Sequence, residues 1–352
     1  DLLGLGDASI VDATIAISIG DNHREIEACR QALDLYQRCG DKERSEFAEA
    51  WLIYANAFTE PEAAISEVEQ FLKHARYANK PAISTHINAA EGVIYGRREP
   101  SRGARAYLRS SAHAKQAGLI RLAIISSGNA CEVFQNISDL ESASQAIEFS
   151  IGLAKQAGWP ALMGFCYAHL GRTERDLGRI QQSRQTLQEA LNFFPSSYAG
   201  INKAIAYREL GETLLVEGNT DQALTSFRDA IDLFRAAESM DDLPHTLIRY
   251  ARALSIANHV EPALMAINEA QQLCKKFNFS ALNVSLHQVL AEIYSRHQLS
   301  APIGINEPNA VIHFLERALS AGSIIDGWQA PPDFLIMLSE AWAHVGDMTK
   351  AL

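Results

Sequence analysis

Apolar residues recur three or four positions apart along most of this chain, which is the spacing of one face of an α-helix. The stretch 218–234 shows the pattern clearly. Its apolar face consists of Ala223, Phe227, Ala230, Ile231 and Phe234. Residues 20–36 share the same order of glycine, polar turn, apolar residue, small residue and aromatic end. The pattern therefore predicts the same amphipathic helix at two distant places.

The residues before this helix predict a second helix that pairs with it. Tyr207, Leu210, Gly211 and Leu214 fall on one helical face, and Gly218 stands where a left-handed helix end is expected. Residues 167–178 repeat this order of aromatic, leucine and glycine. Each unit of the sequence is therefore predicted to be a helical hairpin.

A small residue returns on the second helix of each unit at a nearly fixed interval. These residues are Ala32, Ser110, Ser150, Ala190, Ala230, Ala270 and Ala318. From Ser110 to Ala270 the interval is always 40, and the 78 residues between Ala32 and Ser110 leave room for two units of 39. In the intervening unit Phe71 stands where a small residue is expected. Small side chains let two helix backbones approach closely, so this internal repeat predicts stacked hairpins.

These residues resemble the tetratricopeptide repeat, whose pattern is an aromatic residue, Leu-Gly, and small residues on the second helix. The units that contain Tyr167 and Tyr207 match it specifically, and more degenerate units extend the resemblance over nearly the whole chain. The resemblance implies an all-α, right-handed superhelical solenoid of about eight helix-turn-helix repeats. The period of about 40 residues departs from the 34 that is typical of the family, which implies longer helices or turns.

We expect one solenoid over residues 1–352. Its predicted repeats are 7–40, 43–80, 83–119, 122–159, 162–198, 202–238, 243–278 and 282–326, with a partial repeat at 332–352. Residues 297–309 are predicted to form an inserted loop, because Pro302 and Pro308 exclude a continued helix. The incomplete last repeat, and a first residue other than Met, lead us to expect a fragment of a longer protein.

Composition limits the choice of partners and setting. The formal net charge is −11 and the pI about 5.5, which argues against direct binding of nucleic acid. No run of eighteen apolar residues predicts a membrane span. The cysteines lack metal-ligand spacing, so we expect packing residues in a reduced, cytoplasmic setting. They are Cys29, Cys39, Cys131, Cys166 and Cys274.

The sequence contains no motif for catalysis. It lacks a zinc-protease motif, a phosphate-binding loop, a nucleophile elbow and a dinucleotide-binding glycine run. Its eleven histidines are scattered without metal-ligand spacing. We therefore expect no cofactor, no metal and no enzymatic activity in these residues, while the activity of a longer protein stays open.

The resemblance implies that the first helix of each unit forms the inner wall of the superhelix. Residues beside the apolar stripe of these helices form the candidate groove. They are Asn129, Glu132, Arg172, Arg175, Arg208, Arg249 and Arg252. One interpretation is that these arginines bind carboxylates or phosphates of an acidic peptide or protein, with Asn129 on the peptide backbone. The alternative is a solvated helix face, on which the arginines pair with neighbouring acids such as Glu174, Asp176 or Glu212.

Two exposed aromatic residues give a second candidate surface. Trp159 and Trp328 lie in predicted turns, where each would cover the end of a hairpin or contact another protomer. Self-association is therefore left open.

The resemblance to long-period repeats implies a non-catalytic sensor or regulatory domain of a bacterial signalling protein. A bound ligand would control an attached output domain, with a diguanylate cyclase as the first expectation. The alternatives are the ligand-binding domain of a transcription regulator and a stand-alone adaptor that holds protein complexes together. An enzyme whose site the motifs fail to reveal is a third class.

Overall fold

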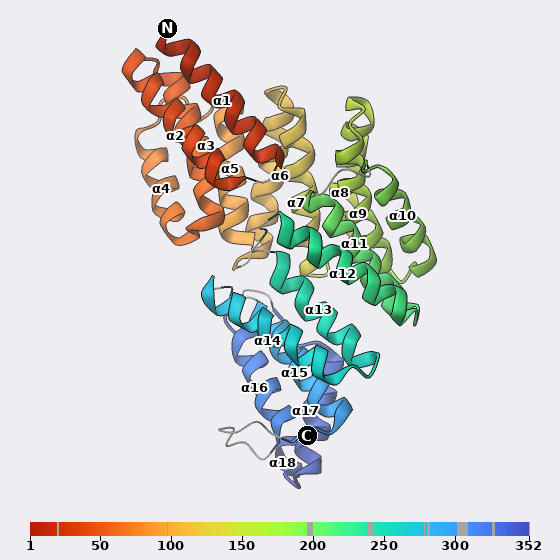
Figure 1. The fold of residues 1–352 in the computed structure, drawn as a ribbon. Coiled ribbons are helices and arrows are strands. Elements are labelled where there is room, and N and C mark those ends of the chain that lie inside the picture. Colours follow the sequence, from red (N-terminus) through yellow and green to blue (C-terminus); the bar gives the residue numbers. More distant parts are fainter. Residues whose placement is uncertain are drawn as a thin grey trace.

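A computed structural model describes residues 1–19, 21–96, 98–195, 200–237, 239, 242–277, 279, 282–300, 309–325 and 328–351. Within these ranges the chain forms 18 helices and no strand (Figure 1). The helices pair into successive hairpins. The prediction of an all-α solenoid of helical hairpins is therefore confirmed.

The helices alternate between the first and the second member of a hairpin. The first members are α1 (Leu2–Ile19), α3 (Lys42–Thr59), α5 (Pro81–Gly96), α7 (Ile120–Asn136), α9 (Pro160–Asp176), α11 (Ile201–Val216), α13 (Asp242–Ile256), α15 (Asn283–His297) and α17 (Pro332–His344). The second members are α2 (Asn22–Cys39), α4 (Pro61–His74), α6 (Pro100–Gln116), α8 (Leu140–Ala157), α10 (Ile180–Asn192), α12 (Thr220–Ala236), α14 (Val260–Lys276), α16 (Ala310–Gly322) and α18 (Met348–Ala351).

The long period comes from long helices joined by short turns. Helices α7, α9 and α12 each have 17 residues. The turn after α9 contains Gly178 at φ +78°, and the turn after α11 contains Gly218 at φ +82°. A residue without Cβ adopts this left-handed conformation without strain. The predicted glycine helix ends are thus confirmed.

The small-residue register coincides with the most deeply buried positions of the second helices. All seven of the small residues have no exposed surface, and Phe71 of α4 is also fully buried. The first helix of a hairpin also approaches the second helix closely. A Cβ added at Gly171 of α9 would lie 2.5 Å from the Leu187 side chain of α10. Larger side chains would force the helices apart, so this spacing depends on the residues that the repeat supplies.

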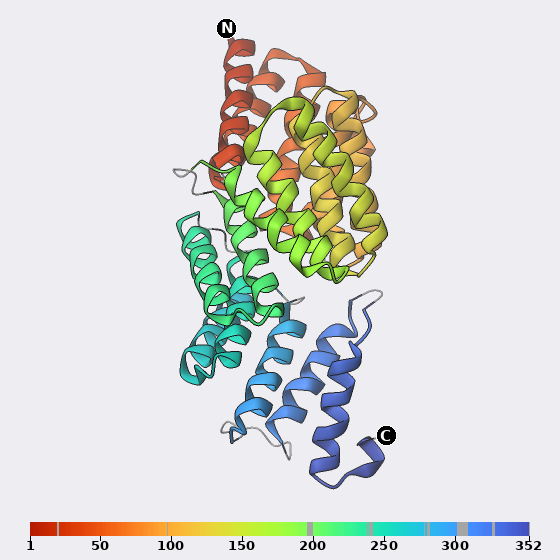
Figure 2. The same cartoon turned by 90° about the vertical axis from the view of Figure 1, so that its right-hand side faces the viewer.

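The hairpins stack into an extended array, with the two chain ends at opposite ends of the molecule (Figures 1 and 2). From α3 to α15, each first helix contacts the next first helix along the chain. We call the surface that these helices share the first-helix face. The largest continuous core lies in the second half of the chain, where α9 to α17 contribute to one apolar cluster.

Several local expectations are refined by the structure. The first hairpin begins at Leu2, and α15 and α16 flank the predicted loop at 297–309, of which residues 301–308 lie outside the described residues. Four of the five cysteines are buried as expected, but Cys39 is exposed because it stands at the end of α2. Trp328 packs against Gly322 and so covers a hairpin end, whereas Trp159 is 43% exposed.

Candidate functional site

The seven candidate groove residues all lie on the first-helix face. Asn129 and Glu132 belong to α7, Arg172 and Arg175 to α9, Arg208 to α11, and Arg249 with Arg252 to α13. The helices are neighbours in space as well as in order, since α7 contacts α9, α9 contacts α11, and α11 contacts α13. The structure therefore brings residues 123 positions apart in sequence onto one surface.

The repeat places charges of alternating sign along this face. At intervals of 40 the chain has Glu132, Arg172, Glu212, Arg252 and Glu292, one from each of α7, α9, α11, α13 and α15. We call these five residues the charge ladder. Acidic residues thus lie between the arginines. The sequence pattern suggested a basic stripe, but the structure shows a stripe of alternating charge.

Glu209 of α11 is the centre of the most buried part of this face. Its carboxylate lies 2.8 Å from Arg175, 3.0 Å from Arg208 and 3.5 Å from Arg249. Burial by itself would raise the pKa of Glu209, but Arg249, Arg175 and Arg208 hold that pKa well below its ordinary value. One ionised carboxylate therefore links three consecutive hairpins.

Most of the other arginines also have partners of their own. Arg208 is only 1% exposed, and besides Glu209 it donates to Asp242 at 2.9 Å. Arg252 reaches the next hairpin, where its Nε and Nη2 each donate to the Glu292 carboxylate at 2.8 Å. These two arginines are occupied by carboxylates of the chain itself, so they have little capacity left for a ligand.

Arg172 differs from the other arginines because most of its donors lack an acceptor. The residue is 7% exposed and its Nη2 donates to Asn136 Oδ1 at 2.7 Å. Its Nε and Nη1 are buried and have no hydrogen-bond partner among the described residues. The nearest carboxylate, that of Asp176, lies 3.6 Å from Nε. A buried donor without an acceptor costs about 1–3 kcal/mol, so such groups call for an explanation.

Glu132 faces the same region from α7 and is not paired either. No hydrogen bond or ion pair joins its carboxylate to another side chain in the described parts of the chain. Burial raises its pKa, but the electrostatic effects of His169, Arg208 and Arg172 together bring the pKa below its ordinary value. Glu132 is therefore an ionised acceptor on the first helix next to that of Arg172, and we call this pair the open rung.

Neutral polar groups surround the open rung. Burial lowers the pKa of His169 to about 4, so this imidazole is uncharged at pH 7. Burial and the nearby Arg249 also lower the pKa of His245, whose Nε2 accepts from Arg249 Nε at 3.2 Å. The Asn129 side chain is half-buried and has no hydrogen-bond partner within the described ranges. The site thus offers a free amide, an unpaired carboxylate and unused guanidinium donors.

The three neighbouring acids that the sequence suggested as partners differ in what they contact. Two of them lie near arginines and one does not. Asp176 lies 3.1 Å from Arg175 and 3.6 Å from Arg172, and Glu212 lies 3.8 Å from Arg249. Glu174 instead faces α10, where Thr186 and Gln182 contact its carboxylate. Sequence reasoning missed Glu209 as the central partner, together with Asp242 and Glu292. The 40-residue interval, applied to the first helices, would have found Glu292 opposite Arg252.

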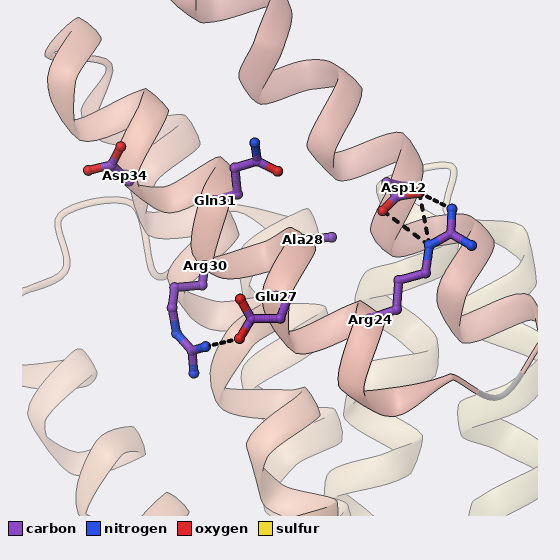
Figure 3. A pocket seen from close by; sticks show the side chains of 7 residues that line it. All are labelled: Asp12, Arg24, Glu27, Ala28, Arg30, Gln31 and Asp34. Atoms are coloured by element: carbon purple, nitrogen blue, oxygen red, sulfur yellow. Dashed lines mark hydrogen bonds and ion pairs between the residues drawn. The ribbon is translucent and has the colours of Figure 1, made fainter.

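Two surface hollows are weaker candidates. One lies between α1 and α2, where Asp12 pairs with Arg24 and Glu27 pairs with Arg30 (Figure 3). Its charged groups are exposed and already satisfied. The other, of about 660 Å³, lies among α12, α13 and α14, and Leu247, Tyr250 and Leu254 contribute to its lining. Neither holds a buried guanidinium with unused donors like that of Arg172.

The described residues contain no group of three side chains suited to hold a metal ion. None of the described helices combines the length and apolar character that a membrane crossing needs.

Comparison with known proteins shows that residues 164–236 match the tetratricopeptide repeat family, so this part of the chain consists of such repeats. A search of curated proteins finds no match. Within residues 164–236 the interval of 40 residues is longer than the 34 typical of this family.

Solved structures share the fold over nearly the whole chain. A Rap protein complexed with competence and sporulation factor has a TM-score of 0.69 at 10% identity, covering 98% of this chain and 94% of the other. NprR in complex with its cognate peptide NprX has a TM-score of 0.67 at 14% identity, with coverages of 100% and 96%. The apo form of the quorum sensor NprR from B. thuringiensis has a TM-score of 0.60 at 13% identity, with coverages of 99% and 95%. At these identities the likeness shows a common fold.

Proposed function

We propose that this chain is a non-catalytic regulatory domain that binds an extended peptide, or an extended segment of a protein, on its first-helix face at the open rung. The single observation that carries the proposal is the open rung itself. Arg172 keeps buried donors without acceptors, Glu132 keeps an ionised carboxylate without a donor, and Asn129 lies one helical turn before Glu132.

An extended peptide suits this set of groups. Its backbone presents alternating donors and acceptors, which the Asn129 amide matches because an amide side chain both donates and accepts. A stacked solenoid presents a long continuous face on which such a segment can lie. Two of the structures with this fold hold a signalling factor or a cognate peptide, which supports a peptide here as well.

The regulatory part of the proposal is that the ligand biases an attached output domain. A diguanylate cyclase is the first expectation and a helix-turn-helix regulator the second, both from the resemblance to long-period repeats. Determining the coding sequence past residue 352 tests this part separately, because a stop codon within a few residues would remove a C-terminal output domain.

A displayed library of random hexapeptides, panned against the purified chain, tests peptide binding. We expect enrichment of a related set of peptides, whose affinity falls about tenfold in Asn129→Ala, since one or two lost hydrogen bonds cost about 1.4 kcal/mol. Asn268→Ala is the matched control, because Asn268 is exposed on the second helix α14. If no peptide is enriched, or if both variants bind the enriched peptides like the parent chain, the proposal fails.

A further inference from the structure

Of the four neighbouring pairs in the charge ladder, only Arg252 with Glu292 is closed in the described structure. Glu212, in the middle of the ladder, lies 3.8 Å from Arg249 instead. Glu132 with Arg172 is open, although it uses the same repeat positions as the closed pair. Arg252 and Glu292 stand 40 residues apart on neighbouring first helices and form a bidentate pair with two contacts of 2.8 Å. Glu132 and Arg172 also stand 40 residues apart on neighbouring first helices. The repeat geometry therefore permits the pair, yet no ion pair joins Glu132 and Arg172 in the described structure.

Arg208 and Glu209, the most buried charged groups beside the open rung, are already engaged. Arg208 donates to Glu209 and Asp242, and Glu209 accepts from Arg175 as well as Arg208. His169 and His245 are neutral and bring no compensating charge. At the open rung itself the unmet demands are opposite. Arg172 Nε and Nη1 need hydrogen-bond acceptors, since Asp176 is 3.6 Å away, and Glu132 needs a donor.

We infer that the open rung binds a dipolar segment, one that carries a cationic side chain for Glu132 and a carboxylate for Arg172. This inference rests on the proposed peptide-binding function and specifies its ligand. A simple anion would approach Arg172 but be repelled by Glu132, and a simple cation would meet the opposite conflict. A segment with both charges supplies the missing partner to each residue.

The distance between the helices sets the spacing of the two charges. Packed helix axes lie about 8–10 Å apart, and an extended peptide advances about 3.3 Å per residue. A basic and an acidic residue two or three positions apart therefore span from α7 to α9. The basic residue lies toward α7 and the acidic residue toward α9, because Glu132 and Arg172 occupy these helices in that order.

Two capped hexapeptide libraries test the inference. One library fixes an arginine and an aspartate two positions apart, and the other fixes glutamine and asparagine at the same places. We expect binders from the charged library only, and at least a tenfold loss when either charge of an enriched peptide is neutralised. The loss should be smaller at high salt, where the charges are screened.

Paired variants assign each charge to its residue. In Glu132→Gln, neutralising the arginine of the peptide should cause no further loss, while neutralising its aspartate still does. In Arg172→Gln the pattern should reverse. Arg235→Gln, which breaks an exposed ion pair between second helices outside the candidate groove, is the matched control and should leave both losses unchanged. Because Arg172→Gln removes a buried charge, Arg172→Lys and thermal melting of each variant separate weaker binding from unfolding.

The outcomes distinguish this inference from the function on which it rests. Equal enrichment from the two libraries, as would follow if only water fills the open rung, overturns the dipolar ligand but keeps peptide binding. The dipolar ligand is also overturned if neutralising a charge of the peptide lowers its affinity as much for Glu132→Gln and Arg172→Gln as for the parent chain. No enrichment from either fixed library or from the random one overturns the proposed function itself.

Discussion

At the scale of single residues, Glu25 of α2 shows how burial changes an acid. Its Oε1 accepts from Trp51 Nε1 at 2.7 Å, and the residue is only 3% exposed. Burial raises the pKa of Glu25 to about 7, against the opposing effect of the Trp51 hydrogen bond. Near neutral pH this carboxyl group is therefore about half protonated.

This shift predicts a pH-dependent stability. Between the ordinary pKa of about 4.5 and the folded value of about 7, the folded chain holds a proton that the unfolded chain releases. The stability that this bound proton contributes is therefore fully present below pH 4.5 and is lost as the pH rises through 7. Glu25→Gln mimics the protonated carboxyl group and does not titrate. The unfolding free energy of the parent should therefore fall, relative to that of the variant, by about 3 kcal/mol from pH 4.5 to pH 8.

Urea unfolding at the two pH values measures this difference. The control is Gln31→Ala on the exposed side of the same helix, which changes no titratable group, so its difference from the parent should not change with pH. A difference that stays constant for Glu25→Gln would mean that the buried carboxyl group is ionised at its ordinary pKa.

Helical glycines give a second test at this scale. A Cβ at Gly171 would lie 2.5 Å from the Leu187 side chain, so Gly171→Ala should cost about 1–3 kcal/mol through overpacking. Gly152 lies within α8 with no neighbouring atom within 4 Å of an added Cβ. Gly152→Ala should therefore stabilise the chain by about 0.5–1 kcal/mol through helix propensity. In chemical denaturation the changes in unfolding free energy of the two variants should have opposite signs. Changes of the same sign would contradict the close approach of the helices at Gly171.

At the scale of helices, Glu209 joins α9, α11 and α13 through three arginines. Glu209→Gln leaves these cations without their shared anion in a buried place, so we expect a loss of about 3–5 kcal/mol in unfolding free energy. Hydrogen exchange should increase mainly in these three helices, because the lost contacts lie there.

The exposed pair between Arg235 and Glu269 provides the matched control for Glu209. It also joins two hairpins, at 2.7 Å, but both side chains are more than 40% exposed. Glu269→Gln should change stability by less than about 1 kcal/mol. If Glu209→Gln lowers the free energy of unfolding as little as Glu269→Gln does, the buried network does not hold these helices together.

At the scale of the whole molecule, stacking should give an extended shape. A compact chain of 352 residues would have a radius of gyration of about 20 Å. The separated chain ends and side-by-side hairpins lead us to expect a clearly larger value in small-angle scattering (Figure 1). A value near that of a compact sphere would contradict the open array.

The overall charge says little about the first-helix face. The chain as a whole carries −11, yet around the open rung five arginines, at 172, 175, 208, 249 and 252, stand beside six carboxylates, at 132, 176, 209, 212, 242 and 292. The interactions at this face depend on which of these charges are paired.

The sequence by itself determined the repeat, the helical hairpins, the glycine helix ends and the buried register of small residues. These features depend on periodicity and on backbone preference, which act over a few residues and are repeated along the chain. The sequence also placed Asn129, Glu132 and Arg172 on the first helices, because the same interval applies there.

Only the tertiary structure decided which charges are paired. The positions of Arg252 with Glu292 and of Glu132 with Arg172 are equivalent in sequence, but only the first pair closes. An ion pair depends on differences of about 1 Å between two helices, which follow from how each hairpin packs on the next. The repeat interval fixes the face on which a charge lies, and packing fixes its partner.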